Sequence, residues 1–282
     1  AITESKSGRE AFAGKTFVDC TGDGDLGALA GCAHRFGHPE TGLCQPMSMI
    51  CLVAGLTREA IKDYHSGEGG DWAGPKDRLR AQMEKGGHSP SYAKPSLFHV
   101  RDDLFILMAN HEYGVKGTDV REVTAATLRA RRELHNLING LHSLGGVWSK
   151  VRIVATAEQI GVREGRRLAG LYELNAEDLR QGRKHPDAVC RTTFPIDVHA
   201  TNPKKEKGIE KASFRAQPYD IPLRSLIARD VRGLLMAGRC ISGDFIAHSS
   251  YRVTGNAVIL GEAAGVTAAL AAVGNKLPPD VP

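Results

Sequence analysis

Apolar residues recur along this chain with two periodicities, one of three to four residues and one of two residues. These periodicities predict which segments are helices and which are strands. The clearest helical pattern covers residues 119–144, where apolar residues recur every three or four positions and arginines and glutamates fill the other face. Asp119 stands where its carboxylate can cap the first turn of that helix. Runs rich in β-branched and aromatic residues predict strands at 15–20, 46–56, 96–110 (two strands around an Asp-Asp turn), the first half of 150–174, parts of 185–222, and 231–243.

Other segments predict a hairpin, a short helix and a long irregular segment. The first residues predict two strands joined by a turn at "SKSGRE", and "NAEDLRQG" predicts a short capped helix. Residues 62–95 hold many glycines and prolines without a clear period, which favours an excursion with short helices. A chain that begins inside a hairpin without Met is expected to be a fragment.

The stretch "FVDCTGDGDLGALAG" runs from a strand through a glycine turn into a helix of small residues. This order is typical of ligand-binding turns in α/β proteins, where Gly22 and Gly24 would let the backbone approach a ligand closely. Asp23 and Asp25 stand near the helix start, so simple helix capping remains an equal alternative for them.

A second stretch, "LLMAGRCISGDFIAHSSYRVTGNAVILGEAAG", has the same order. Its strand is expected to end at Gly238-Arg239, followed by a polar loop and a helix whose start carries Gly255 and a capping Asn256. Small residues along that helix suit close packing, and its unpaired N–H groups suit an anionic ligand. The loop also gathers several polar side chains near the end of a strand: Asp244, His248, Ser249 and Arg252.

Composition narrows the classes of protein to consider. The 282 residues are 41% apolar and 24% charged, which is ordinary for a globular protein. The formal charge of +5 is scattered and aromatic residues make up only 6%, so nucleic-acid binding is not expected. Residues 257–273 form the most apolar run, but Glu262 and the alanine content favour a packed helix over a membrane span.

Cysteine and histidine spacing gives no metal site. None of the six cysteines lies in a CxxC pair, and several stand in apolar runs where a free thiol acts as a core residue. This usage indicates a reducing compartment, and we expect the cytoplasm. His34 and His38 have helical spacing but no carboxylate or thiol partners beside them, so no metal is expected.

Taken in order, these motifs resemble a known family over nearly the whole chain. "FVDCTGDGDLGALAG", "QPMSMICLVAGL", "GVREGRRLAGLYEL", "FPIDVH", "LLMAGRCIS" and "YRVTGNAVILGEAAG" are similar to motifs of FAD-dependent oxidoreductases of the glutathione-reductase-like superfamily. Gly165 stands where that family has Ser. The resemblance implies FAD as cofactor, a small-molecule substrate and an electron acceptor of unknown type. It leaves the oligomeric state open, a homo-oligomer included.

The resemblance also implies roles for particular residues. Thr21, Gly22 and Asp23 would lie near the ADP half of FAD, and Gly238 with Arg239 would reach the pyrophosphate or ribityl chain. The backbone of Gly255, Asn256 and Ala257 would face the N1/O2 edge of the flavin ring, where a helix start stabilises negative charge. The candidates for substrate binding or proton transfer are Arg163, His248 and Arg252.

The fold that this resemblance implies is α/β. It is a Rossmann-like FAD/NAD(P)-binding domain, formed by residues 1–45 and 223–282, with an α+β substrate domain inserted at 46–222. Its first βαβ unit, with the GxGxxG turn, is missing from this sequence. The function implied is hydride transfer between flavin and a small molecule. The alternative is a non-catalytic α/β binding module that keeps the flavoprotein fold and binds no FAD.

Overall fold

The chain is a mixed α/β protein made of two compact units. The computed structural model describes residues 1–65 and 71–281. Unit 1 comprises Ala1–Leu43, Glu164–Val198 and Lys211–Pro282, and unit 2 comprises Cys44–Arg163 and His199–Glu210. Unit 1 therefore includes residues 164–198 and 211–222, which the sequence assigns to a substrate domain. The functional division into nucleotide and substrate domains stays a prediction.

Unit 1 contains short strands and four helices among its described residues. Its strands are β1 (Ile2–Ser5), β2 (Gly8–Ala11), β3 (Phe17–Asp19), β4 (His34–Arg35), β9 (Arg167–Leu168), β10 (Ala188–Thr192), β11 (Tyr219–Pro222) and β12 (Leu234–Met236). Its helices are α1 (Asp25–Leu29), α4 (Ala176–Gln181), α5 (Phe245–Tyr251) and α6 (Thr254–Gly274), with 3-10 turns at η2 (Leu223–Ser225), η3 (Gly238–Cys240) and η4 (Pro278–Asp280).

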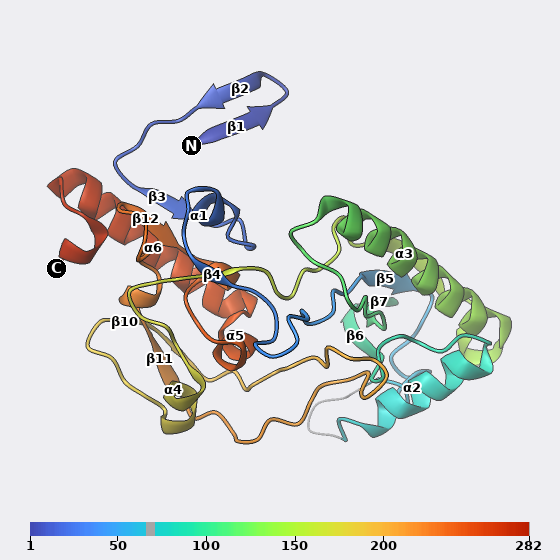
Figure 1. The fold of residues 1–282 in the computed structure, drawn as a ribbon. Coiled ribbons are helices and arrows are strands. Elements are labelled where there is room, and N and C mark those ends of the chain that lie inside the picture. Colours follow the sequence, from blue (N-terminus) through green and yellow to red (C-terminus); the bar gives the residue numbers. More distant parts are fainter. Residues whose placement is uncertain (66–70, 282) are drawn as a thin grey trace. The chain divides into compact units, whose positions relative to one another are not determined.

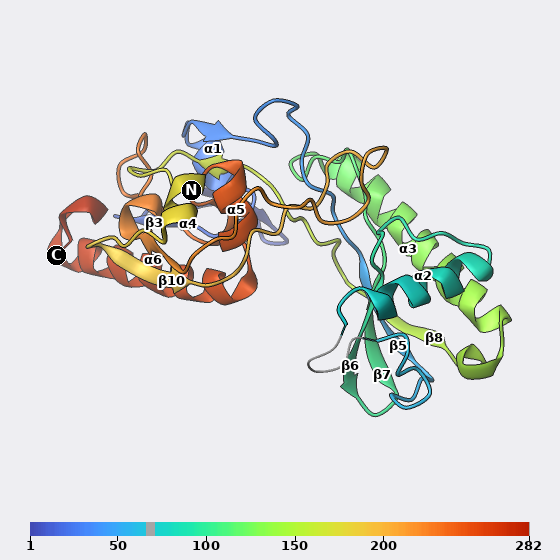
Figure 2. The ribbon, with the colours of Figure 1, turned by 90° about the horizontal axis from the view of Figure 1, so that it is seen from below.

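The centre of unit 1 is a pair of parallel strands from distant parts of the chain. β12 pairs with β3 in a register that runs from Leu234 opposite Phe17 to Met236 opposite Asp19. Both strands therefore end at the same edge, where ligands of α/β proteins collect. Helix α6 packs against both strands and runs alongside β10 (Figure 2). Its close approach uses the small side chain of Ala264, which is fully buried.

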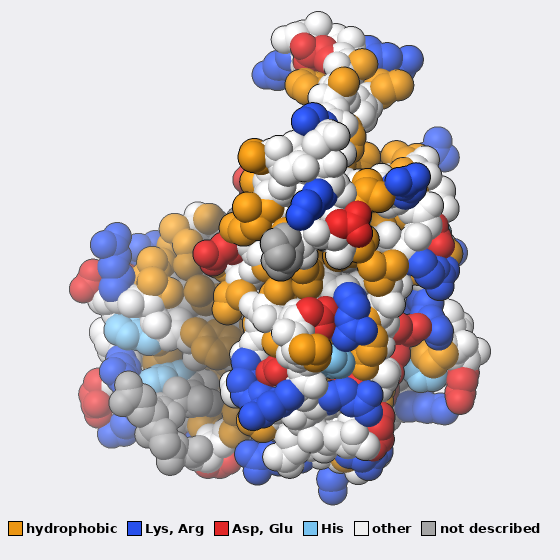
Figure 3. Space-filling model, turned by 90° about the vertical axis from the view of Figure 1, so that its left-hand side faces the viewer, with side chains coloured by type: hydrophobic (Ala, Val, Ile, Leu, Met, Phe, Trp, Pro, Cys, Tyr) orange, Lys and Arg blue, Asp and Glu red, His pale blue; other side chains and the backbone are white. Residues whose placement is uncertain are grey.

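The N-terminal hairpin differs from the rest of unit 1. β1 and β2 pair antiparallel, and every residue of both strands is exposed. Figure 1 labels the hairpin at the top of its view, and Figure 3, turned about the vertical axis, shows it standing clear at the top. The hairpin is held by its own backbone pairing and contributes nothing to the core of the unit.

Unit 2 is a four-stranded antiparallel sheet with two long helices on one face (Figure 2). The strand order is β6-β7-β5-β8. Its elements are β5 (Ile50–Ala54), α2 (Gly74–Lys85), β6 (Ser96–Arg101), β7 (Leu104–Met108), α3 (Val120–Ser143), η1 (Gly146–Trp148) and β8 (Arg152–Thr156). Leu134, Leu137 and Leu141 on α3 face the sheet in one apolar core with Phe105 and Leu107 of β7.

Most predicted elements are confirmed. Asp119 caps α3 by accepting hydrogen bonds from the backbone N–H groups of Arg121 and Glu122 (2.8 and 3.2 Å). The predicted Asp-Asp turn joins β6 and β7, with Asp102 at a positive φ of 45°. The expected excursion at 62–95 contains α2, and residues 66–70 of it lie outside the described residues.

Two local predictions near the C-terminus are wrong. The expected polar loop after β12 contains helix α5, because Asp244 caps a turn whose apolar side chains are buried. Asn256 does not cap the last long helix, which already begins at Thr254 with Val253 as its N-cap residue. Asn256 instead lies inside the first turn.

Helix α6 is the one described helix that is long and apolar enough to cross a membrane. This is weak evidence for a span, because core helices of soluble proteins can have the same length and composition. Ala264, Thr267 and Ala271 of α6 are buried in unit 1. The expectation of no membrane span therefore stays a prediction.

Candidate functional site

The turn after β3 is organised by one buried carboxylate. Asp19, the last residue of β3, is fully buried and accepts three hydrogen bonds. Two come from the N–H and hydroxyl of Thr21 (3.0 and 2.7 Å), and one comes from the N–H of Gly27 in α1 (2.8 Å). The Thr21 hydroxyl in turn accepts from the N–H of Asp25 at the start of α1 (2.8 Å). Asp19 and Thr21 thus fix the turn that carries Gly22 and Asp23.

Gly22 lies against the guanidinium group of Arg239. A Cβ added at Gly22 would stand 2.5 Å from Nη2 of Arg239, and Gly22 also has a positive φ of 80°. Both facts require glycine here, since other residues pay for positive φ and for the contact. The turn after β3 and the turn after β12 are therefore in direct contact.

The two acidic residues of the turn pair with arginines from other segments. Arg239 lies 3.4 Å from Asp23, and Arg166 forms a 2.7 Å ion pair with Asp25. Burial raises the pKa of Asp23 above its ordinary value, and the charge of Arg239 opposes that rise. A Cβ at Gly165 would collide with the Asp23 side chain, which accounts for glycine at that position. Neither aspartate caps α1 with its side chain, because the N-cap residue is Gly24.

The end of β12 meets the beginning of α6. Gly238 has a positive φ of 78°, and a Cβ there would just touch Ala257 in the first turn of α6 at 4.0 Å. No side chain caps α6 at its N-cap residue, Val253. A Cβ at Gly255 would meet no described atom within 4 Å. The first turn of α6 therefore offers N–H groups, a positive dipole end and space beside Gly255.

The side chain of Asn256 points into unit 1. Its amide group donates to Thr192 Oγ1 (3.0 Å) and to the carbonyl of Tyr251 (3.2 Å), and the residue is 9% exposed. These bonds anchor the first turn of α6 to β10 and to the end of α5. Only the backbone of Asn256 is left to contact a ligand.

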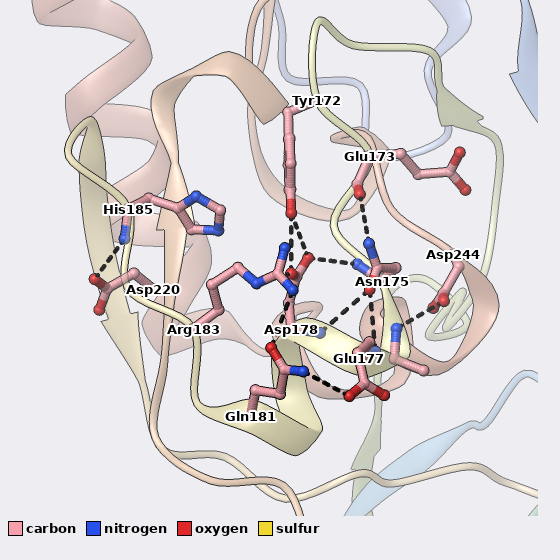
Figure 4. A network of polar contacts seen from close by, with 11 residues as sticks. Tyr172, Glu173, Asn175, Glu177, Asp178, Gln181, Arg183, His185, Asp220 and Asp244 are labelled. Carbon is pink, nitrogen blue, oxygen red and sulfur yellow. Dashed lines mark hydrogen bonds and ion pairs between the residues drawn. The ribbon is translucent and has the colours of Figure 1, made fainter.

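Helix α5 is positioned by Asp244, which holds two helices at once. One carboxylate oxygen accepts from the N–H of Ala247 in α5 (2.7 Å), and the other accepts from the N–H of Ala176 in α4 (2.8 Å). Figure 4 shows Asp244 beside the capping box of α4, in which Asn175 and Asp178 bond each other's backbone N–H groups. Asp244 is thus a structural cap, as the residue type suggests.

His248 lies in α5 with no exposed surface. Burial lowers its pKa well below the ordinary value, and the charges of Arg252, Arg167 and Arg239 lower it further. Neither ring nitrogen has a hydrogen-bond partner among the described residues, and the ring packs edge-on against Tyr251 at 5.4 Å. His248 is therefore a neutral imidazole inside unit 1 in this structure.

The two arginine candidates lie in different units. In unit 1, Arg252 follows α5 and donates to the backbone carbonyl of Asp197 at 2.7 Å, and its side chain is only 8% exposed. In unit 2, Arg163 donates to the carbonyl of Pro46 and to the Ser48 hydroxyl (2.9 Å). Both guanidinium groups are thus held by well-defined polar partners.

Sequence reasoning missed two buried charged residues of unit 1, Asp19 and Arg167. Arg167 forms an ion pair with Glu164, and both side chains are almost fully buried. Asp19 was overlooked because its neighbours Gly22 and Gly24 give the stronger local signal. A carboxylate at the last position of a buried strand, two residues before Thr21, is the signal that could have identified it.

The structure brings the eight cofactor candidates of the sequence into one arc of unit 1. Gly22 and Asp23 lie against Arg239, Thr21 precedes them in the same turn, and Gly238 lies next to Ala257 at the start of α6. The arc suits a long ligand with anionic groups. It combines glycine backbone, an uncapped helix start and a guanidinium group whose Nε is buried without a partner among the described residues. This donor set fits FAD, which carries a pyrophosphate and a flavin edge that becomes negative on reduction.

Comparisons with known proteins give the family of the chain and its cofactor. No curated protein and no solved structure matches the chain. A family model described as FAD dependent oxidoreductase matches residues 1–282, which is the whole chain. The cofactor is FAD, and the protein is an FAD-dependent oxidoreductase enzyme. The chain therefore belongs to the FAD dependent oxidoreductase family.

Proposed function

We propose that this enzyme transfers hydride between FAD and a small-molecule substrate. The observation that carries the proposal is the meeting of three backbone ends in unit 1. β3 and β12 are parallel and end at one edge, and the uncapped start of α6 lies against Gly238 at that edge. This arrangement is how α/β folds bind dinucleotides, and it supports a Rossmann-like assignment for unit 1.

Each part of the arc would hold a different part of FAD. Thr21, Gly22 and Asp23 would lie near the ADP half, and Arg239 would neutralise the pyrophosphate. The first turn of α6, from Gly255 to Ala257, would face the N1/O2 edge of the ring. The bound flavin supplies the hydride acceptor or donor, and the helix start favours its reduced, anionic form.

The chain's own residues would bind and orient the substrate. Arg163 and Arg252 are our candidates for a carboxylate or another anionic substrate group, because both guanidinium groups are held in place by backbone carbonyls. His248 is the third candidate of the sequence for substrate binding or proton transfer. Its complete burial supports a different task, which is to hold the α5–α6 corner as a neutral ring. The electron acceptor stays open.

A further strand and helix would complete the FAD site. Among the described strands, β3 pairs only with β12, so its other edge is open. Helix α6 exposes Val258, Val266 and Leu270 along one side. We propose that a GxGxxG strand–helix unit, absent from this sequence, adds to the β3 edge and covers that side of α6. With it the Rossmann-like domain would be complete.

Location and assembly are also proposals. None of the six cysteines, all of which are described, forms a disulfide, and five of them are buried, which supports a reducing compartment such as the cytoplasm. A homo-oligomer stays a possibility that the chain's own surface does not decide. Size-exclusion chromatography with light scattering decides the oligomeric state.

The first experiment is a visible absorption spectrum of the full-length gene product. The proposal predicts the two absorption bands of oxidised flavin, which bleach when dithionite is added. A folded protein that stays colourless after incubation with FAD would instead establish the binding module.

A glycine substitution tests the position of the flavin. Gly255→Ala introduces a methyl group into open space near the start of α6, and alanine favours helix by about 1 kcal/mol, so the fold is retained. If the flavin edge lies there, FAD affinity falls at least tenfold. Gly261→Ala is the matched control, since its Cβ also meets nothing within 4 Å and it lies further along the same helix. Equal FAD affinity in both variants would place the flavin elsewhere.

A further inference from the structure

Unit 2 contains a chain of titratable rings that the proposed FAD site does not use. His199 Nδ1 lies 3.1 Å from His111 Nε2, and His111 Nδ1 lies 3.1 Å from the Tyr113 hydroxyl. His199 is the last residue of the "FPIDVH" stretch. Three ring side chains thus form one line of hydrogen bonds.

These rings are buried and packed in place. His111 and His199 are 2% and 5% exposed, and Tyr113 is half-buried. The ring of Tyr92, itself 1% exposed, lies 4.3 Å from the His111 ring and 5.9 Å from the His199 ring. The line therefore runs from a partly exposed phenol to an imidazole inside unit 2.

Backbone contacts fix both imidazoles. The N–H of His199 donates to Gln45 Oε1 (2.8 Å), and the N–H of His111 donates to the Ser91 hydroxyl (2.7 Å). The charge of Arg163 acts on His111 and, after burial, is the second cause that lowers its pKa to about 2. Both the surroundings and the burial therefore favour a neutral ring. Burying so many polar groups costs free energy that an apolar core would avoid, which favours a functional reason for them.

We propose that Tyr113, His111 and His199 form a proton relay within unit 2 that takes up or releases one proton during the reaction. The proposal rests on the oxidoreductase function, since hydride transfer to or from carbon is usually accompanied by a proton. His199 is the inner end of the relay and Tyr113 is the end that exchanges with water. The three residues hold and move a proton; none is assigned to contact with substrate.

The proton count balances between a first and a last state in which all three side chains are neutral, and Tyr113 is a phenolate in between until water reprotonates it. Initially Tyr113 O–H donates to His111 Nδ1, and His111 Nε2–H donates to His199 Nδ1, whose own proton is on Nε2. When His199 releases its Nε2 proton, the Nε2 proton of His111 moves to His199 and the Tyr113 proton moves to His111. Tyr113 then takes one proton from water. One proton leaves and one enters, and both imidazoles change tautomer.

Nitrogen NMR of the full-length protein labelled with 15N-histidine tests the relay without any substrate. Because a relay requires both tautomers, we expect ring nitrogens of His111 and His199 to show shifts averaged between protonated and unprotonated values at pH 7. Tyr113→Phe removes the outer donor and acceptor, so both rings should then settle into one tautomer. Two rings that already have fixed tautomers in the wild type would overturn the proposal.

A matched control separates the relay from general packing. Tyr64→Phe makes the same change in unit 2, where the Tyr64 ring packs on Trp148 at 5.0 Å, and should leave both histidine spectra unchanged. An equal effect of both variants would mean that the shifts report packing and would overturn the relay. Because these spectra need no FAD, they can fail while the flavin spectrum appears, or succeed while it does not.

Discussion

The guanidinium group of Arg239 lies directly against the α-carbon of Gly22, so that a Cβ on Gly22 would stand 2.5 Å from its Nη2 atom. Gly22 follows β3 and Arg239 follows β12, which are parallel neighbours. The contact therefore joins the two strand ends at which we place FAD. It also means that one methyl group can move the one arginine of the arc.

Gly22→Ala should weaken FAD binding more than it weakens the fold. Positive φ costs an alanine about 1–2 kcal/mol of stability, and the flexible end of Arg239 can move away from the new methyl group. Since that movement takes the guanidinium from its place, we expect FAD affinity to fall about tenfold or more. Urea denaturation and a flavin-fluorescence titration measure the two quantities.

Gly31→Ala provides the comparison for this substitution. Gly31 also has positive φ, at 94°, but a Cβ there meets nothing within 4 Å. Its stability loss should be similar while its FAD affinity stays at the wild-type value. If both variants lose affinity equally, backbone strain and not Arg239 explains the effect.

Asp19→Asn should loosen the whole turn after β3. The carboxylate accepts three hydrogen bonds, and an amide has one oxygen and brings N–H groups toward donors. A hydrogen bond to a charged group contributes about 1.5–3 kcal/mol to stability. We therefore expect Asp19→Asn to lower the free energy of unfolding by about 2–3 kcal/mol. Asp25→Asn makes the same change in a half-exposed ion pair and should cost less than about 1 kcal/mol. Similar losses in the two variants would contradict the organising role of Asp19.

Most helices and strands could be predicted because their periodicity and their capping residues lie within their own sequence. The three- and four-residue spacing of Leu134, Leu137 and Leu141 defines the buried face of α3, and Asp119 marks its start without any knowledge of the sheet. The turn between β6 and β7 was equally visible in two adjacent aspartates. Helix α5 was missed because its seven residues include His248 and two serines, whose burial comes only from the surrounding unit.

The pairing of distant segments was beyond such patterns. Nothing in "KTFVDC" or "LLMAGRC" indicates that β3 and β12 are neighbours, and the resemblance to a family predicted only that both segments belong to one domain. The line from Tyr113 through His111 to His199 joins residues that no motif connects. Polar groups of this kind are recognised only when burial and distance are known.

The buried neutral ring of His248 makes stability depend on pH. Its pKa is depressed in the folded protein and is about 6.5 in the unfolded chain, so below pH 6.5 the unfolded state takes up a proton that the native state excludes. Stability is therefore complete above pH 6.5 and falls as the pH decreases, by about 2 kcal/mol between pH 8 and 5 from this group. His111, whose pKa is about 2, adds a decrease of the same sign in unit 2.

Urea denaturation at several pH values checks this dependence. His248→Gln removes the titrating group, so the difference from wild type should shrink steadily from pH 8 to pH 5. His34→Gln makes the same change at an exposed histidine and serves as the control. A His248→Gln variant with the wild-type slope would show that His248 is protonated in the native state as well.

Asp244→Asn tests whether one carboxylate sets the position of the α6 start. Its two oxygens hold the first N–H groups of α5 and α4, and Arg252 at the end of α5 is only two residues before Thr254. An amide can accept through one oxygen only, so one helix loses its cap at a cost of about 1–2 kcal/mol.

Unlike an ordinary helix cap, Asp244 is expected to affect FAD binding as well as stability. If α5 shifts, Gly255 and its neighbours shift with it. FAD affinity should then fall, and the backbone amide of Ala176 or Ala247 should exchange its hydrogen faster. Glu177→Gln changes an exposed carboxylate of α4 in the same way and should leave both measurements near wild type. Lost protection with unchanged FAD affinity would mean that α6 keeps its place through Asn256 and β10 alone, because those bonds are independent of Asp244.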